Sequence, residues 1–180
     1  RRGFSAAACA AQACCLMRIY LAGPDVFRRD AHAWAGEARR LCSEFGHEAL
    51  TPLDNDEVTA DRIYQSNVAL IGRADCVVAN LNPFRGDEPD SGTCVEVGMA
   101  LAAGKRVVGY LATGDSLADR LSKAGRIQKT GAGGRLEDTQ GHAVEDFGLP
   151  LNLMLAVPLS IVTGGLREAL AALTHGPQSA

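Results

Sequence analysis

Two carboxylates stand near the start of one predicted helix, at Asp90 and Glu96. Glu96 lies within a run of apolar and small residues that extends from Cys94 to Ala103. Burying a charge among such residues costs free energy unless the charge is stabilised locally. Backbone N–H groups and the helix dipole favour an anion near a helix start, so Glu96 is a candidate working carboxylate.

A structural role would explain either carboxylate almost as well. Thr93 precedes Glu96 by three residues, which is the spacing of a capping box, and Asp90 could cap the helix or close a turn. If both carboxylates face one pocket, the pair suits covalent catalysis at a sugar carbon, in which one carboxylate attacks and another group handles the leaving base. The spacing alone leaves these alternatives open.

Three further residues are candidates for such a site. Tyr20 lies on a predicted strand from which its hydroxyl could orient a carboxylate, although packing in the core would explain it equally well. Asn67 lies on the apolar stripe of a predicted helix, where a buried Asn needs a hydrogen bond, either from a ligand or from a nearby loop. Gly23 begins the turn Gly23-Pro24, which either lets a ligand approach the backbone or makes a tight connection.

The elements that must position these residues alternate between strand and helix. Strands are predicted at 18–22, 47–50, 75–79, 106–111 and 159–162, and helices at 30–45, 60–73, 115–124 and 165–173. A further helix is predicted to open directly after Asp90 and to be apolar or small from Cys94 to Ala103. Segment 147–156 is predicted as a short helix or apolar segment, and segment 125–141, rich in Gly and charge, as a mobile loop. This order predicts an α/β fold, a single-domain doubly wound five-stranded parallel sheet of the flavodoxin-like type.

The unusual polar clusters all follow predicted strands. They lie at residues 23–27, 52–56 and 80–93, directly after the first three strands. Ligands of doubly wound folds bind at the carboxyl ends of the strands, near the point where the strand order reverses. The sequence therefore predicts one site at this edge, whereas Asp75, at the opposite end of its strand, is predicted to be structural.

Composition and motifs exclude several other classes of protein. The 180 residues are 47% hydrophobic and 22% charged, with a net charge of −3, which gives no attraction to nucleic acid or to an anionic membrane. No apolar run reaches the roughly 18 residues of a membrane span. Neither G-x-G-x-x-G after the first strand nor G-x-x-x-x-G-K-[ST] is present. His32, His47, His142 and His175 have no metal-ligand spacing and are predicted at the surface or in loops.

The cysteines and the chain ends complete the organisation. Six cysteines without a C-x-x-C pair indicate a cytoplasmic protein with structural thiols rather than a disulfide framework or zinc site. The domain is expected at 17–175, with a tail at 176–180. Residues 1–16, Arg-led, Ala-rich and free of acids, could be a transit peptide, but a loosely ordered extension ahead of a natural start at Met17 is favoured.

Several segments together resemble the nucleoside 2-deoxyribosyltransferase family. They are residues 19–27 (IYLAGPDVF), Asn67 with Asp75, residues 82–98 (NPFRGDEPDSGTCVEVG) and residues 145–154 (EDFGLPLNLM), and the similarity spans nearly all of 18–174. The family transfers a 2-deoxyribosyl group between nucleobases in nucleoside salvage, by double displacement, with no metal or cofactor. The resemblance implies the same activity here, with deoxynucleosides and free nucleobases as ligands and a homo-oligomer, a dimer or larger, whose subunits share active sites.

The resemblance also implies roles for individual residues. Glu96 matches the nucleophile that attacks C1′ of the sugar, and Tyr20 matches the hydroxyl that holds this carboxylate. Asp90 matches a carboxylate that binds the 5′-hydroxyl side of deoxyribose. The expected catalytic residues are therefore Glu96, Tyr20 and Asp90.

The remaining matches are expected to bind substrate. They are Gly23, Asp25 and Phe27 after the first strand, Asp56 in a base-contacting loop, Asn67 near the base, and Asn152 and Met154, which a neighbouring subunit contributes. The Asn at position 67 and the long loop 84–89 resemble the purine-preferring branch of the family.

Two other functions compete with this one. A related hydrolase, an N-glycosidase of 2′-deoxynucleoside 5′-monophosphates, needs a phosphate cradle. Asp25 would repel a phosphate there, although Arg28, Ser91 and Thr93 are possible ligands. A non-catalytic nucleotide-sensing module on the same fold would not need Glu96.

Overall fold

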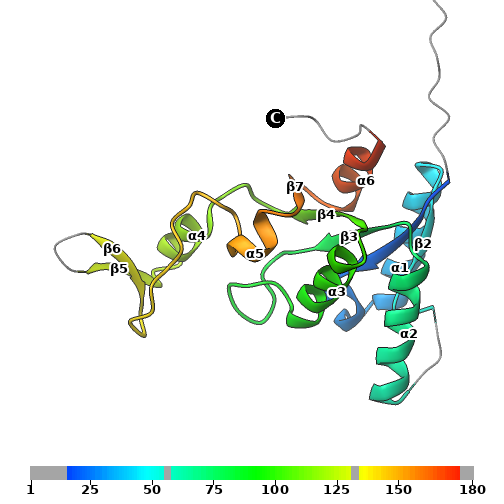
Figure 1. Ribbon diagram of the computed structural model, residues 1–180, viewed down its shortest axis with the longest axis horizontal. Helices are drawn as coiled ribbons and strands as arrows, with labels where there is room; N and C mark the ends of the chain where they lie inside the picture. The colour runs from blue at the N-terminus through cyan, green and yellow to red at the C-terminus, as the bar shows by residue number, and fades with distance from the viewer. Residues whose placement is uncertain (1–15, 55–57, 131–133, 175–180) are drawn as a thin grey trace, which may run out of the picture.

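Five parallel strands form the centre of the structure, a computed structural model that describes residues 16–54, 58–130 and 134–174 (Figure 1). The strands are β1 (Arg18–Ala22), β2 (Glu48–Leu50), β3 (Cys76–Asn80), β4 (Arg106–Leu111) and β7 (Ser160–Thr163). Their order in the sheet is β2-β1-β3-β4-β7, with every neighbouring pair parallel. This order confirms the predicted flavodoxin-like α/β fold, and the strand order reverses between β1 and β3.

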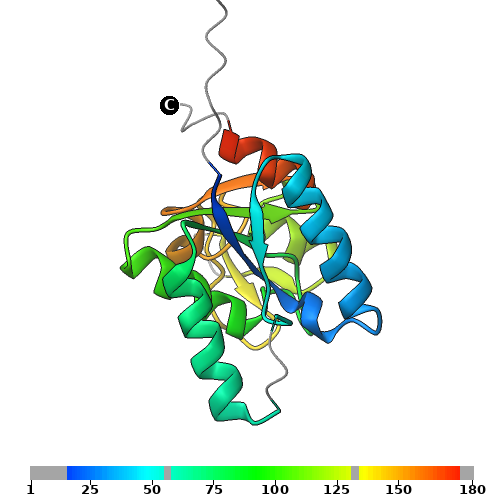
Figure 2. The ribbon, with the colours of Figure 1, turned by 90° about the vertical axis from the view of Figure 1, so that its right-hand side faces the viewer.

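Helices cover both faces of the sheet, because the side chains of each strand alternate between the faces. Ile19 and Leu21 of β1 pack with α1 (Ala31–Glu44) and α6 (Leu166–Thr174). Tyr20 and Ala22 pack on the other face, with α2 (Ala60–Arg73) and α3 (Ser91–Ala102). Figure 2 shows the two layers of helices on either side of the sheet, with β2 at its outer edge.

Two glycines allow the backbone to pack closely at the sheet. A Cβ atom on Gly109 of β4 would lie 2.5 Å from Cδ1 of Leu81. A Cβ atom on Gly23 would lie 2.8 Å from Cβ of Asn80, at the end of the neighbouring strand β3. The turn after β1 therefore has a structural need for glycine, whatever else it does.

The segment predicted as a mobile loop is instead largely a β-hairpin, so that prediction is wrong. Strands β5 (Ile127–Thr130) and β6 (Arg135–Asp138) pair antiparallel, and with α4 (Leu117–Lys123) they lie away from the central sheet (Figure 1). The sequence signal was present, since a Gly-rich stretch between two short strand-like runs is typical of a hairpin turn. Elements η1 (Pro24–Phe27) and α5 (Leu153–Ala156) complete the fold.

Several predicted structural residues have the expected roles. Asp75 accepts hydrogen bonds from the backbone N–H and the guanidinium of Arg18, at 2.7 and 3.0 Å, at the amino ends of the strands. Cys42 and Cys76 are buried free thiols whose pKa is raised to about 11 by burial, so they are poor nucleophiles. His47 lies in the loop between α1 and β2, which is one of its two predicted positions, but it is not at the surface, since it is only 4% exposed beside α1 and α2.

Three expectations fall outside the described residues. They concern the extension at 1–16, apart from Leu16, the tail at 176–180, and the base-contacting Asp56. Within the ranges that the structure describes, no helix is long and apolar enough to cross a membrane.

Candidate active site

A cavity of about 360 Å³ lies at the carboxyl ends of the strands, between α2 and α3. Its lining comes from the three segments that follow β1, β2 and β3, as the sequence predicts, and from one side of α2. The lining residues are Gly23, Val26, Phe27, Pro52, Leu53, Ile63, Asn67, Asp90, Gly92, Thr93 and Glu96. We call this cavity the Glu96 pocket.

Tyr20 holds the Glu96 carboxylate through a hydrogen bond. The Tyr20 hydroxyl donates a hydrogen bond of 2.6 Å to Oε1 of Glu96, although the two residues are 76 positions apart in the chain. Tyr20 is fully buried in the centre of the sheet, so the position of its hydroxyl is set by the core. Tyr20 thus makes the contact with a carboxylate that the sequence had left open.

The helix begins directly after Asp90, as predicted, and its first residues decide the capping question. α3 starts at Ser91, with Asp90 as its N-cap, because Oδ2 of Asp90 accepts hydrogen bonds from the N–H and hydroxyl of Thr93, at 2.9 and 3.0 Å. Glu96 is therefore the sixth residue of the helix and is not part of a capping box. A capping role is wrong for Glu96 and correct for Asp90.

The surroundings of Glu96 bring the pKa of its carboxyl group close to neutral pH. Burial raises its pKa to about 7, the hydrogen bond from Tyr20 opposes this rise, and the negative charge of Asp90 adds to it. Burial and the neighbouring carboxylate also raise the pKa of Tyr20 far above its usual value, so its hydroxyl remains a donor. A carboxylate that ionises near neutral pH inside a pocket is a functional-site candidate.

Asp90 and Asn67 bring unused polar atoms to the same pocket. Oδ1 of Asp90 has no hydrogen bond with any described residue, since both bonds of the cap go to Oδ2. Oδ1 of Asn67 is buried and has no partner among the described residues. Buried polar groups are rarely unpaired, so Asn67 is a candidate for a ligand contact, and the partly buried Asp90 has one oxygen that the helix cap does not use.

An aromatic stack borders the pocket, and the sequence analysis identified only one of its members. Phe27 lines the pocket and stacks on Phe84, with ring centroids 5.4 Å apart and an angle of 16° between the planes. The guanidinium carbon of Arg85 lies 5.0 Å from the centroid of Phe27 and 4.6 Å from that of Phe84. With 57% of its surface exposed, Phe27 offers a flat apolar face to a planar ligand.

Asp25 does not line the pocket, although the sequence analysis expects it to bind substrate. It is only 7% exposed and accepts a hydrogen bond of 2.9 Å from Nδ2 of Asn80. Asn80 in turn accepts from the backbone and side chain of Asn82, through Oδ1. In this structure Asp25 joins the turn after β1 to the end of β3.

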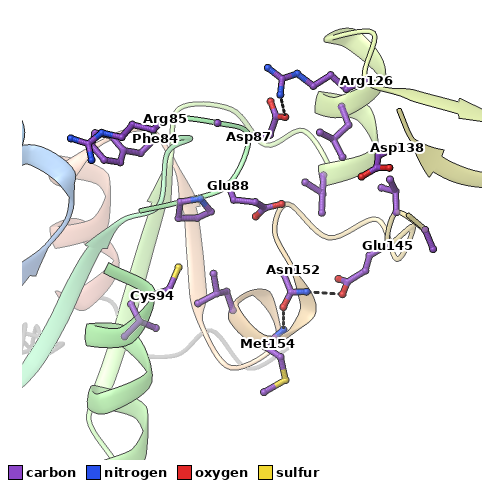
Figure 3. Close-up of a pocket in the computed structure, with 18 of the residues that line it drawn as sticks. Phe84, Arg85, Asp87, Glu88, Cys94, Arg126, Asp138, Glu145, Asn152 and Met154 are labelled. Carbon is purple, nitrogen blue, oxygen red and sulfur yellow. Dashed lines mark hydrogen bonds and ion pairs between the residues drawn. The ribbon is translucent and has the colours of Figure 1, made fainter. Parts of the chain in front are cut away.

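Asn152 and Met154 lie in a different and larger cavity, of about 1050 Å³, on the other side of α3 (Figure 3). Asn152 caps α5 by accepting from the Met154 N–H at 3.0 Å, and it donates to Glu145 at 2.7 Å. Met154 is 73% exposed. Within one chain, therefore, these two residues do not face Glu96. We call this second cavity the Asn152 cavity.

The family model described as nucleoside 2-deoxyribosyltransferase matches residues 19–154. The chain belongs to the nucleoside 2-deoxyribosyltransferase family. This family assignment stands beside the geometry of the Glu96 pocket. The pocket combines a carboxylate with a raised pKa, a tyrosine hydroxyl and an exposed aromatic face.

Individual known proteins are also similar to this deoxyribosyltransferase-family chain. A solved structure of a 2-deoxyribosyltransferase from Leishmania mexicana is 32% identical, covers 89% of this chain and 98% of that chain, and superposes with a TM-score of 0.73. An uncharacterized protein of Schizosaccharomyces pombe is 30% identical over 162 residues, 76% of this chain and 74% of its own length. A CMP N-glycosidase of Clostridium botulinum matches at 17% identity and a TM-score of 0.47, covering 87% of this chain and 98% of that one.

Proposed function

We propose that this protein transfers the 2-deoxyribosyl group from one nucleobase to another, with Glu96 as the nucleophile. The observation that carries the proposal is the half-buried Glu96 carboxylate, hydrogen-bonded by Tyr20 at 2.6 Å and with a pKa of about 7. Such a group is ionised enough at neutral pH to attack and is poorly solvated, so its attack has little hydration to lose.

The reaction takes two displacement steps. In the first, an oxygen of Glu96 forms a bond to C1′ while the C1′–N bond breaks, and its electron pair leaves with the base, which takes up a proton. In the second, a nitrogen of the incoming base attacks C1′, loses its proton, and releases the Glu96 carboxylate. The missing 2′-hydroxyl helps both steps, because no electron-withdrawing group opposes the oxocarbenium-like charge.

The other residues of the pocket have complementary tasks in this proposal. The Tyr20 hydroxyl holds the carboxylate in the orientation for attack. The free Oδ1 of Asp90 accepts a hydrogen bond from the 5′-hydroxyl, and the free amide oxygen of Asn67 accepts one from the base. The exposed face of Phe27 stacks on the base, and Gly23 lets the ligand approach the backbone.

We further propose that Asn152 and Met154 reach the Glu96 pocket of a neighbouring copy in a homo-oligomer, a dimer or larger. Exposed apolar side chains lie on the three elements that such contact would cover: Ile63 and Tyr64 on α2, Val95 on α3, and Met154 and Val157 at α5. Apolar surface of this kind is typical of protein–protein contacts. A second subunit over the pocket would also keep water from the glycosyl ester.

The activity is tested by incubating deoxyinosine with free adenine and separating the products by chromatography, with thymidine and deoxycytidine as parallel donors. We expect deoxyadenosine from deoxyinosine, and less from the pyrimidine donors if purines are preferred. The variant Glu37→Ala, on the exposed surface of α1, serves as a control that retains exchange. Absence of exchange with every donor would contradict the proposal.

The same assay separates the competing functions. An N-glycosidase of 2′-deoxynucleoside 5′-monophosphates would release free base from the monophosphate faster than from the nucleoside. In this structure the guanidinium of Arg28, one candidate for a phosphate cradle, is paired with Asp30 through two contacts of 3.0 Å. Tight nucleoside binding without any turnover would instead indicate a sensing module.

Shared sites are tested by subunit complementation. Glu96→Ala and Asn152→Ala should each lose exchange, and the two chains expressed together should recover part of it, because a mixed oligomer contains an intact site. Light scattering should show a dimer or larger. An active monomer, or an active Asn152→Ala variant, would contradict this part of the proposal and leave the role of Glu96 unaffected.

A further inference from the structure

A third cavity, of about 610 Å³, runs along the outer edge of β2, between α1 and α2. Figure 2 views the molecule from this side, with β2 between the two helices. Its lining residues are Arg39, Ser43, His47, Glu48, Ala49, Leu50, Asp54, Leu70 and Arg73. The cavity shares none of these residues with the Glu96 pocket or the Asn152 cavity, and the proposed reaction uses none of them. We call it the β2-edge cavity.

His47 is the least explained residue of this cavity. Its side chain is buried, with 4% of the residue exposed, and neither Nδ1 nor Nε2 has a hydrogen-bond partner among the described residues. Its backbone N–H is fixed by a 2.9 Å bond to the carbonyl of Cys42, which holds the ring in place after α1. An imidazole carries a donor and an acceptor, or two donors when protonated, and buried polar groups are seldom unpaired. A polar group in the cavity would satisfy it.

The two arginines of the cavity are in different states. Arg39 is already engaged, because its guanidinium contacts Asp54 and donates to the Thr51 hydroxyl at 3.2 Å. Arg73, in the last turn of α2, has no ion pair or hydrogen bond within the described part of the chain. The Asp54 end of the cavity is therefore neutralised internally, whereas the Arg73 end has an unpaired cation.

The donors gather at the end of the cavity that lies by the amino ends of the strands. His47 directly precedes β2, Arg73 closely precedes β3, and Ser43 is in the last turn of α1. A guanidinium, an imidazole and a hydroxyl together suit an anion with several acceptor oxygens. Glu48 is the other carboxylate of the lining. It is exposed to solvent at the start of β2, so its negative charge repels a bound anion only from the solvent side of the cavity.

We propose that the β2-edge cavity binds a tetrahedral oxyanion, inorganic phosphate or the phosphate of a small phosphomonoester, through Arg73, His47 and Ser43. A phosphate group occupies only part of about 610 Å³, and cavities of this size hold small organic molecules. The rest of the lining includes the apolar side chains of Ala49, Leu50 and Leu70, which suit the organic part of a phosphomonoester.

The test measures binding rather than activity. The purified protein is titrated by calorimetry with inorganic phosphate and, separately, with glycerol 3-phosphate, and histidine ring resonances are followed by NMR. We expect saturable binding with one site per chain and a shift of the His47 ring, which the variant His47→Gln identifies by its missing signal. The tighter of the two probes tells whether the free anion or an ester is preferred.

Matched variants locate the site. Arg73→Ala should weaken binding at least about tenfold, the loss expected for one charge-assisted hydrogen bond. Arg135→Ala, which removes the same charge from β6, and Glu96→Ala in the Glu96 pocket should leave it unchanged. Arg73 is exposed, so Arg73→Ala should leave the core intact. His47→Gln, in contrast, replaces a buried residue. Failure of both probes to saturate, equal affinity in Arg73→Ala, or an unmoved His47 ring would overturn the proposal.

Discussion

α3 separates two cavities that differ both in size and in chemistry. Gly92, Thr93 and Glu96 face the Glu96 pocket, of about 360 Å³, whereas Cys94, Val97 and other residues on the opposite side of the helix line the Asn152 cavity, of about 1050 Å³.

The larger cavity is mostly satisfied within itself. Arg126 pairs with Asp87 at 2.7 Å, and Glu145 accepts hydrogen bonds from Asn152 and from the N–H of Leu153, at 2.7 and 2.9 Å (Figure 3). The smaller pocket contains a carboxylate with a raised pKa and two unpartnered polar oxygens. Burial also raises the pKa of Glu88 in the Asn152 cavity, so what distinguishes the candidate active site is the carboxylate that a buried tyrosine holds, rather than volume.

The largest expected effect comes from residues two positions apart on this helix. Glu96→Ala should reduce base exchange on the order of 10³ to 10⁶-fold, since it removes the proposed nucleophile. Cys94→Ala, in the lining of the Asn152 cavity, should change exchange by less than about threefold. Rates of deoxyadenosine formation, with circular dichroism to verify folding, decide between them. Undiminished exchange in Glu96→Ala would break the distinction between the cavities.

Tyr20→Phe tests whether the hydrogen bond to Glu96 sets its ionisation. The bond favours the charged carboxylate, so its loss should raise the pKa of Glu96 from about 7 by roughly one to two pH units. Exchange falls as the pH drops through this pKa because only the carboxylate attacks. The acid limb of kcat/KM against pH should therefore move upward, lowering activity at pH 7 by roughly five- to fiftyfold. An unmoved acid limb would mean that another group controls it.

Asn67→Ala should have a more moderate effect, mainly on substrate binding. Losing one hydrogen bond from a buried amide costs about 1 to 2 kcal/mol, which is roughly a five- to thirtyfold rise in KM for the donor nucleoside. Gln140→Ala removes an amide from the lining of the Asn152 cavity and serves as the matched control. Steady-state kinetics with deoxyinosine measure both variants, and equal KM values for the two would place the base elsewhere.

The smallest expected effect is on thermal stability. Replacing a glutamate by glutamine should stabilise the fold in the Glu96 pocket and destabilise it in the Asn152 cavity. The pKa of Glu96 is raised on folding, so ionising it destabilises the fold as the pH rises from about 4.5 to about 7. Above pH 7, Glu96→Gln should thus raise the melting temperature by roughly 2–6 °C, and at pH 4 it should change little. Glu145→Gln should lower it, because a donor amide would face Asn152 or Leu153. Calorimetry at pH 4 and 8 tests both signs.

Local sequence patterns determined much of the fold. The alternation of short apolar runs with 3-4 spaced segments was sufficient for the five parallel strands and the flanking helices, because burial of one face imposes its period on the residues. The hairpin β5-β6 was missed because charge and glycine suggested a loop. The sequence placed Asp90 directly before the start of α3, and the structure confirms this position, with Asp90 as the N-cap.

The site required the tertiary structure. The sequence itself contained Glu96, Tyr20, Asp90 and Asn67, and the order of strands placed their segments at one edge of the sheet. Only folding brings Tyr20 to 2.6 Å from Glu96, leaves the amide oxygen of Asn67 without a partner, and removes enough water to raise the pKa of Glu96 to about 7. Contacts between residues far apart in the chain and the loss of solvent are properties of packing, and no local pattern encodes them.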